Sequence, residues 1–420
     1  MSLSAAPVSS MNLCDARFLA DPHPVQEALR RMGPAVYLTP HRVWAIPRHG
    51  GIRRILRDEN GEFTADRGIT LPGPADPGIQ PGAMPAVDRE ARSQLLPLLA
   101  RQLGRRAVAK LAEQVQGRAD RLVGEHTASG TFDAIVLARE LVAGTVMELM
   151  GLPEGIRSQI LAQASASADI SGPFPHRGPH GLPGSAALVP LLRQNVSRGH
   201  VQPRSWLGVV LRAVDAGRLA EAEAIPFACA FLTAGLDTTI LGLAEAMTQL
   251  ARHPGQWAEL RGDPSLAEWA FHEALRLEAP VLAAARRAVR DVDLDGVRID
   301  AGEAVWLLYG SAGRDPFRWG PTADVFNVHR PFVEHHLAFG SQVHQCAGAP
   351  LAVLQAGCLL RALIDHCAGL SLSGEPVRSS TSVVRGLVSS PLAVEAKASS
   401  RRCRAPRWEQ PAASGTVAVR

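Results

Sequence analysis

A helix-rich single domain with small β-sheets near both ends is the fold that this 420-residue sequence predicts. Long apolar segments with helical spacing fill the middle of the chain, whereas short alternating segments between turn residues lie toward its ends. Hydrophobic residues make up 46% of the chain, enough for a large core. We therefore expect one mainly α domain over residues 16–397, between a flexible lead (1–15) and a disordered tail (398–420).

The first quarter of the chain predicts short elements separated by turns. Two apolar runs flank Pro40 and His41, a pattern typical of an antiparallel hairpin. The predicted elements are, in order, a helix over 24–32, a hairpin over 35–46, a helix over 52–57, a Pro/Gly-rich loop over 71–85 and a helix over 88–103.

The rest of the chain predicts long helices followed by strands. The segment 171–184 is too dense in Pro and Gly for a helix, and its pattern fits a lid over a pocket and a surface excursion equally well. The later predicted elements are a buried central helix over 221–250, a helix over 265–277, a hairpin over 292–299, a helix over 349–363 and strands within 371–394.

Composition and charge exclude several classes of protein. The net charge is only +4 and no basic tract is interleaved with aromatic residues, which argues against nucleic-acid binding. The six cysteines form no CxxC pair and no signal peptide precedes them, which indicates reduced thiols in the cytoplasm. Because no uncharged apolar stretch reaches about 18 residues, we expect no membrane insertion.

One cysteine stands in an unusual setting. Cys346 lies in the segment FGSQVHQCAG (339–348), directly before the apolar run that predicts a helix. The positive end of a helix dipole lowers the pKa of a nearby thiol and favours the thiolate, which is the form that binds metals. Glycines on both sides leave room for a flat group to approach the sulfur. Taken alone, a buried structural cysteine is the commoner interpretation.

Three further features of the sequence include polar or charged residues, and each of them, taken alone, also has an ordinary explanation. Gly235, Asp237 and Thr238 interrupt the apolar central helix, where a local kink would also explain them. Glu273 and Arg276 are spaced i,i+3 on one helix face, an arrangement that is also common on protein surfaces. Two isolated arginines, Arg92 and Arg286, are individually most typical of solvated positions.

In this order and at these separations, the features resemble the cytochrome P450 haem-thiolate monooxygenases, over residues 24–394. The resemblance implies haem b, with Cys346 as the axial ligand of the iron. It implies that Arg92, Arg286 and His344 hold the haem propionates, a role suited to guanidinium–carboxylate geometry. The implied haem-binding set comprises Arg92, Arg286, Phe339, Gly340, His344, Cys346, Ala347 and Gly348.

The same resemblance assigns the other features. Asp237 and Thr238 match the acid–alcohol pair that delivers protons during oxygen activation, and Gly235, with Ala234, matches the place where the helix opens for dioxygen. Glu273 and Arg276 match a buried pair that a third arginine completes, for which Arg330 is the candidate.

Two departures from the family pattern concern the haem site. Gln342 stands where the family almost always has glycine, so its side chain would strain the loop if this position needs a positive φ. Asp88 stands where a propionate-binding histidine is usual, which leaves Arg92 alone on that helix.

Within the family, the segments 33–38, 66–68, 231–239 and 310–316 and the run Arg385–Leu387 resemble soluble bacterial enzymes that oxidise small aromatic acids. This likeness implies hydroxylation or oxidative O-demethylation of an aromatic carboxylate. Against it, three consecutive alanines (283–285) indicate a roomier pocket and a larger apolar natural product. The expected substrate contacts are Arg67, Leu232, Ala283, Ala284 and Val384.

The source of electrons follows from what the sequence lacks. No flavin or iron–sulfur segment is present, so we expect NAD(P)H electrons to arrive through a separate ferredoxin and ferredoxin reductase. We also expect the protein to be a monomer. Two alternatives remain. A peroxide-using haem enzyme is disfavoured by Asp237 and Thr238, and a haem-binding protein with impaired catalysis is supported only by Gln342 and Asp88.

Overall fold

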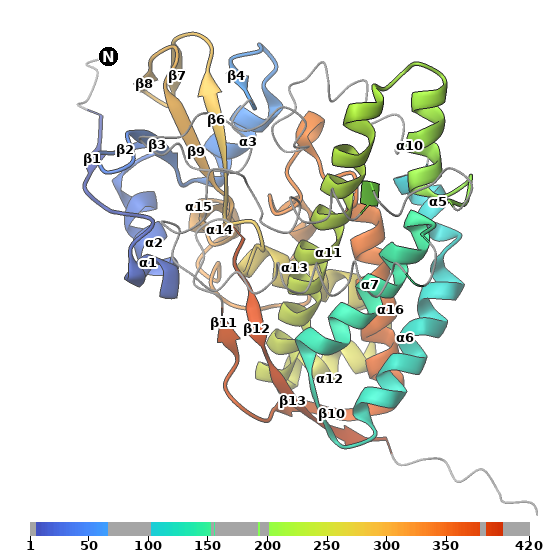
Figure 1. Ribbon diagram of the computed structural model, residues 1–420. Helices are drawn as coiled ribbons and strands as arrows, with labels where there is room; N and C mark the ends of the chain where they lie inside the picture. The colour runs from blue at the N-terminus through green and yellow to red at the C-terminus, as the bar shows by residue number, and fades with distance from the viewer. Residues whose placement is uncertain are drawn as a thin grey trace, which may run out of the picture.

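The computed structural model divides into a β-rich part and a larger helical part, the blue and pale-gold left side and the green, yellow and orange right side of Figure 1. It describes residues 6–65, 102–152, 155, 192–193, 201–378 and 384–397. Several predicted features lie outside these residues: Arg67, Asp88, Arg92, the loop 71–85, the helix 88–103 except its last two residues, the segment 171–184 and the tail 398–420.

The β-rich part is built on a six-stranded sheet that combines distant segments of the chain. Its strands, in spatial order, are β1 (Val8–Ser9), β2 (Val36–Leu38), β3 (Val43–Ile46), β9 (Ala304–Leu308), β6 (Ala283–Ala288) and β4 (Phe63–Thr64). The hairpin predicted around Pro40 is confirmed, since β2 and β3 pair antiparallel. Trp306 on β9 is among the largest fully buried side chains and anchors this core.

The predicted flexible lead over residues 1–15 is wrong for residues 6–15, which are ordered. Strand β1 pairs parallel with β2, and Leu13 is completely buried. Asp15 caps the helix α1 (Ala16–Ala20) by accepting a hydrogen bond from the backbone N–H of Phe18. Because this stretch has a strand, a cap and a buried side chain, residues 6–15 belong to the folded unit.

The predicted hairpin over 292–299 is confirmed as β7 (Val292–Leu294) and β8 (Val297–Ile299). Its two turn residues, Asp295 and Gly296, have φ angles of 52° and 86°. Left-handed backbone at both central positions is the type I′ turn that suits a two-residue hairpin.

The predicted helices are present wherever the structure describes them. The helices of the described residues, after α1, are α2 (His23–Met32), α3 (His49–Arg57), α5 (Arg105–Ala109), α6 (Ala112–Thr127), α7 (Ala134–Met150), α10 (Trp206–Asp215), α11 (Glu221–Arg252), α12 (Pro254–Gly262), α13 (Ala267–Leu277), α14 (Tyr309–Gly313), α15 (Pro316–Trp319) and α16 (Ala349–His366). A 3₁₀ turn, Pro264–Leu266, precedes α13, and Asp263 caps it. Helices α7, α10, α13 and α16 pack around α11, which crosses the helical part (Figure 1).

Helix α11 also has the length and composition of a membrane span over Phe227–Arg252, although 69% of its most apolar window is buried inside the protein. Burial of this kind is what a core helix shows.

Two small sheets pack against the helical part. One joins β10 (Cys367–Leu372), β13 (Pro391–Ala396) and β5 (Thr131–Asp133), and the other joins β11 (Val377–Arg378) and β12 (Leu387–Ser389). The carboxylate of Asp133 caps α7 and also accepts hydrogen bonds from Ser389 Oγ and the backbone N–H of Ser390. This side chain therefore ties the C-terminal strands to the helical part.

Candidate active site

The segment around Cys346 forms a tight loop in front of α16. The backbone N–H of Cys346 donates to the carbonyl oxygen of Phe339 at 2.7 Å. Gly340 has a φ of 68°, and a Cβ added there would lie 2.4 Å from the carbonyl oxygen of His344. Only glycine fits this position, because both the backbone angle and the close approach exclude a side chain.

The sulfur of Cys346 lies beside the first turn of α16. Gly348 is the N-cap residue of this helix, and a Cβ added there would lie 3.8 Å from Cys346 Sγ. Cys346 is exposed, whereas Cys229 and Cys367 are buried. Burial raises the pKa of Cys229 to about 12 and that of Cys367 to about 11, which makes both thiols inert at neutral pH. Among the cysteines of the described residues, Cys346 has the setting of a metal ligand.

A cluster of aromatic side chains lies against the start of this loop. The ring of Phe339 lies 5.4 Å from that of His336 and 6.0 Å from that of His272, measured between centroids. His336 Nδ1 accepts a hydrogen bond from Ala338 N, so its Nε2 is the donor to His272 Nδ1, 3.0 Å away. Burial lowers the pKa of His272 to about 4 and that of His336 well below its ordinary value. The two neutral rings thus hold Phe339 in place, a contact that no local motif in the sequence indicates.

Gln342 begins the 3₁₀ turn Gln342–His344 with a φ of 53°. This position therefore has the left-handed backbone that would explain why the family almost always has glycine here. Outside glycine, asparagine and aspartate, this conformation costs roughly 1 kcal/mol. The side chain itself is exposed, so the cost arises from the backbone.

Replacing Gln342 with glycine is expected to raise the free energy of unfolding by about 0.5–1 kcal/mol, because glycine adopts a positive φ without strain. Urea denaturation of the two proteins measures the difference. Gln345→Gly is the matched control, since Gln345 is equally exposed but has a φ of −61°. Glycine there should instead lower the free energy of unfolding. Equal effects of both substitutions would contradict the assignment of strain to residue 342.

The middle of α11 has one accessible stripe on an otherwise buried helix. Ala234 is exposed and Gly235, Asp237 and Thr238 are partly exposed. Thr238 Oγ1 donates a hydrogen bond to the carbonyl oxygen of Ala234 at 2.7 Å. Ala234 and Thr238 thus lie one helical turn apart, and Gly235 and Asp237 flank this pair on its two sides.

The predicted opening of α11 at Gly235 is not observed, because the helix runs uninterrupted from Glu221 to Arg252. A Cβ added to Gly235 would nevertheless have no described atom within 4 Å. The space beside the stripe thus comes from the missing side chain and not from a break in the helix.

Asp237 has an altered proton affinity. Burial raises its pKa to about 6, and the positive charge of Arg139 on α7 opposes this shift. A carboxyl group with a pKa near neutrality exchanges protons readily at physiological pH. Arg139 carries no recognisable motif, so only the packing of α7 against α11 reveals it.

Glu273, Arg276 and Arg330 form one buried ionic cluster. The guanidinium of Arg276 donates to Glu273 Oε2 at 2.7 Å and to Oε1 at 2.8 Å, and Arg330 Nε donates to both oxygens at 2.9 and 3.1 Å. Arg276 also donates to the carbonyl oxygens of Gly313, Ala323 (2.5 Å) and Val325 (3.1 Å). The cluster fixes the irregular segment 313–330, which leads toward the Cys346 loop.

Arg286 lies on β6 with its guanidinium buried. Its Nη1 donates to the carbonyl oxygen of Ala285 at 2.7 Å, whereas its Nε has no partner among the described residues. A buried N–H without a partner is costly, and a carboxylate is the natural acceptor for it. Arg286 thus suits the predicted role of holding a propionate.

The predicted substrate contacts do not all face one space. Because side chains alternate along a strand, Ala284 shares a face of β6 with Arg286, whereas Ala283 packs with Trp306 and Leu308. Leu232 is completely buried in the helical core. Leu232, Ala283 and Ala284 are thus all buried, with 0%, 1% and 4% of their surface exposed, whereas Val384 is partly exposed.

The residues present fit a haem. Cys346 supplies an accessible sulfur, Gly235 leaves space beside the polar stripe of α11, and Arg286 offers a buried donor that lacks an acceptor. Of the predicted haem-binding set, only Arg92 lies outside the described residues. Cys346 would bind the iron, Arg286 and His344 would hold the propionates, and Gly235 would leave room for the group beside α11.

The chain is similar to known proteins over most of its length. The family model described as cytochrome P450 matches residues 191–395. Cytochrome p450 CYP199A2 of Rhodopseudomonas palustris is 33% identical over 379 residues, covering 89% of this chain and 91% of that protein. The cytochrome P450 monooxygenase PikC of Streptomyces venezuelae is also 33% identical, over 403 residues that cover 93% of this chain and 95% of that protein.

Solved structures show the same architecture. Cytochrome P450 CYP109Q5 from Chondromyces apiculatus superposes with a TM-score of 0.76 at 26% identity, over 92% of this chain and 98% of that one. P450BioI in complex with an acyl carrier protein superposes with a TM-score of 0.79 at 25% identity, over 90% of this chain and 100% of that one.

Proposed function

Because the chain belongs to the cytochrome P450 family and is a haem-dependent monooxygenase, we propose that it inserts one oxygen atom from O2 into a small aromatic carboxylate. The outcome would be hydroxylation or oxidative O-demethylation. Haem supplies the oxygen-activating chemistry in this family, with a cysteine thiolate on the iron and electrons from redox proteins. In this chain Cys346 is the residue for that role.

The accessible sulfur of Cys346 at the start of α16 is the observation that carries the proposal. The N-terminal end of the helix stabilises the thiolate. The backbone bond from Cys346 N to Phe339 O, together with the packing of Phe339 on His272 of α13, holds the Cys346 loop against that helix.

Asp237 and Thr238 are proposed to move protons. The carboxyl of Asp237 takes a proton from solvent and releases it readily, because burial has raised its pKa to about 6. The hydroxyl of Thr238 is anchored by the carbonyl oxygen of Ala234, which leaves its lone pairs directed away from that oxygen to accept from a second donor. A peroxide-using enzyme would not need this pair.

The likeness of the segments 33–38, 231–239 and 310–316 to enzymes that oxidise small aromatic acids supports this substrate class. A second candidate is a larger apolar natural product. It is favoured by the small side chain of Ala284 on the same strand face as Arg286.

Substrate-induced changes in the haem spin state test the substrate class. The purified holoprotein is titrated with benzoate and its 4-methoxy, 4-ethyl and 4-hydroxy derivatives, and in parallel with macrolide and terpenoid compounds. A shift of the Soret band with the aromatic acids, absent for the corresponding methyl esters, supports the proposal. A shift with only the larger compounds refutes it and favours the second candidate.

A ferredoxin with its reductase is the proposed electron source, acting on a monomer in the cytoplasm. Arg105, Arg106 and Lys110 are exposed on or next to α5, which packs against α16. The charge of Arg105 also reaches His272, which places this basic group on the side of the Cys346 loop. Such a surface would attract an acidic ferredoxin, and the rate of reduction should fall as ionic strength rises.

A further inference from the structure

Glu278, at the end of α13, binds four basic side chains. Its Oε1 lies 2.9 Å from His23 Nε2 and 2.7 Å from Arg314 Nη2. Its Oε2 lies 3.1 Å from Arg385 Nη1 and 3.5 Å from Arg378 Nη1. Burial alone would raise the pKa of Glu278, but these partners lower it below its ordinary value, so the carboxylate stays charged.

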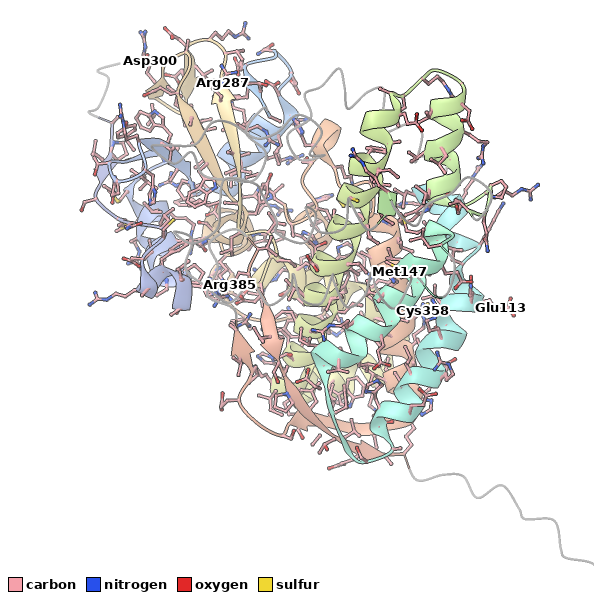
Figure 2. The ribbon with its side chains drawn as sticks, in the orientation of Figure 1. Glu113, Met147, Arg287, Asp300, Cys358 and Arg385 are labelled. Atoms are coloured by element: carbon pink, nitrogen blue, oxygen red, sulfur yellow. The ribbon has the colours of Figure 1, made fainter. Side chains whose placement is uncertain are left out.

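The four partners come from segments far apart in the sequence. His23 begins α2, Arg314 follows α14, Arg378 ends β11 and Arg385 precedes β12. Arg385 Nη2 also donates to the carbonyl oxygen of Ala20, at the end of α1. Figure 2 labels Arg385 between the blue N-terminal helices and the red C-terminal strands. Glu278 is therefore the point at which the N-terminal helices, α13 and the C-terminal strands meet.

The backbone beside Arg385 runs along the segment that leads into β6. Arg385 N donates to the carbonyl oxygen of Pro280 at 2.8 Å, and Val384 forms an isolated antiparallel bridge with Val281. On the other side, a Cβ added to Gly386 would lie 2.5 Å from a methyl carbon of Leu241 on α11. Val384 is thus held in a narrow segment between the start of β6 and α11.

A single bridge specifies strand register weakly, and a slip of one residue turns each side chain to the opposite face. The bond between Glu278 and Arg385 supplies a second constraint on the same pairing. Arg378 ties the same ionic cluster to α11, because it also bonds to Glu245 there at 2.9 Å, seven residues after Thr238. The segment of Val384 is thus bound to the start of β6, and the cluster beside it is bound to α11.

We propose that Glu278 is a positioning residue that sets the shape of the substrate pocket by holding Val384 in register against β6 and α11. The inference rests on the proposed function, since it assumes that Val384 would line the substrate pocket of a haem enzyme. It assigns to an ion-pair cluster outside the pocket a role in ligand selection. A purely structural role would affect stability alone.

Two azole ligands of different size separate these roles. Imidazole is small enough to bind a haem iron with little contact to the surrounding protein, whereas the phenyl group of 4-phenylimidazole would pack against the pocket walls. In Glu278→Gln holoprotein the dissociation constant for 4-phenylimidazole should rise about tenfold, and that for imidazole should change less than about twofold. Asp324→Asn is the matched control, because Asp324 bonds to Arg314 without contacting Arg378 or Arg385. It should leave both constants unchanged.

Arg385→Lys provides a second variant if Glu278→Gln yields too little folded protein, because it keeps the charge and loses only the forked geometry. It should weaken 4-phenylimidazole binding in the same direction. Hydrogen exchange of residues 384–389 should also become faster in both variants. Loss of stability with unchanged affinity and unchanged exchange would overturn the proposal, as would equal weakening of both azoles.

The two proposals fail in different ways. If the unaltered protein gave no spectral shift with imidazole, the proposed function would fail. Hydrogen exchange would still decide whether Glu278 holds the segment of Val384.

Discussion

Replacing Glu273 with glutamine is expected to lower the free energy of unfolding by about 3–5 kcal/mol, because two buried guanidinium groups lose their only carboxylate in the cluster. The side chains of Glu273 and Arg276 are fully buried, and that of Arg330 is 5% exposed. A loss of this size is a large part of the stability of a typical domain. Urea denaturation measures it, and the yield of haem-containing protein should fall in parallel.

An exposed ion pair of the same length is the matched control. Arg298 Nε lies 2.7 Å from Asp300 Oδ1, the distance that also joins Arg276 to Glu273, but both side chains are more than half exposed. Asp300→Asn should therefore cost less than about 1 kcal/mol. Similar losses for the two variants would show that burial of the cluster does not determine its importance.

Replacing Asp237 with asparagine is expected to slow substrate oxidation by about 10²-fold, because proton delivery loses its titratable group. The haem content and the spectrum of the resting protein should remain unchanged. Product formation measured with a saturating ferredoxin and reductase tests this. Unchanged turnover in Asp237→Asn would remove Asp237 from the proton path.

The rate of substrate oxidation should depend on pH through the protonation of Asp237. With a pKa of about 6, the protonated fraction of Asp237 falls tenfold for each pH unit above that value. The rate should therefore decline as pH rises above about 6 in the unaltered protein and stay flat in Asp237→Asn.

The stability of the Asp237→Asn variant should rise although its activity falls. Burial penalises the ionised form of Asp237, so the folded protein carries this penalty above the folded pKa, and asparagine removes it. Asp237→Asn should raise the free energy of unfolding at neutral pH by about 1–3 kcal/mol. A variant that is more stable and less active is the expected result for a residue kept for function.

Local patterns in the sequence were sufficient for several of the regular elements. The apolar spacing of α11 and the Asp295–Gly296 turn of the β7–β8 hairpin each predict their structure within a few residues. Strand β1 was missed because Val8–Ser9 is too short for an alternating pattern, and only its pairing with β2 orders it. Its order depends on tertiary contact and not on local propensity.

The residues of the candidate site also divide into those that a sequence motif indicates and those that only the structure reveals. Cys346 and the Asp237–Thr238 pair stand in short motifs, so the sequence could point to them. Arg139, His272 and His336 act through packing between distant segments, and the single sequence carries no signal for such contacts. Gln342 lies between these cases, since its departure from the family pattern is visible in the sequence but its φ of 53° is not.

The carbon-monoxide difference spectrum of the reduced protein tests the central claim, that Cys346 provides the thiolate ligand of a haem iron. The unaltered protein should show the strongly red-shifted Soret band of a thiolate-ligated haem. Cys346→Ser should lose that band, while Cys358→Ser, which changes a buried thiol elsewhere on α16, should keep it. A red-shifted band that survives in Cys346→Ser would contradict the account.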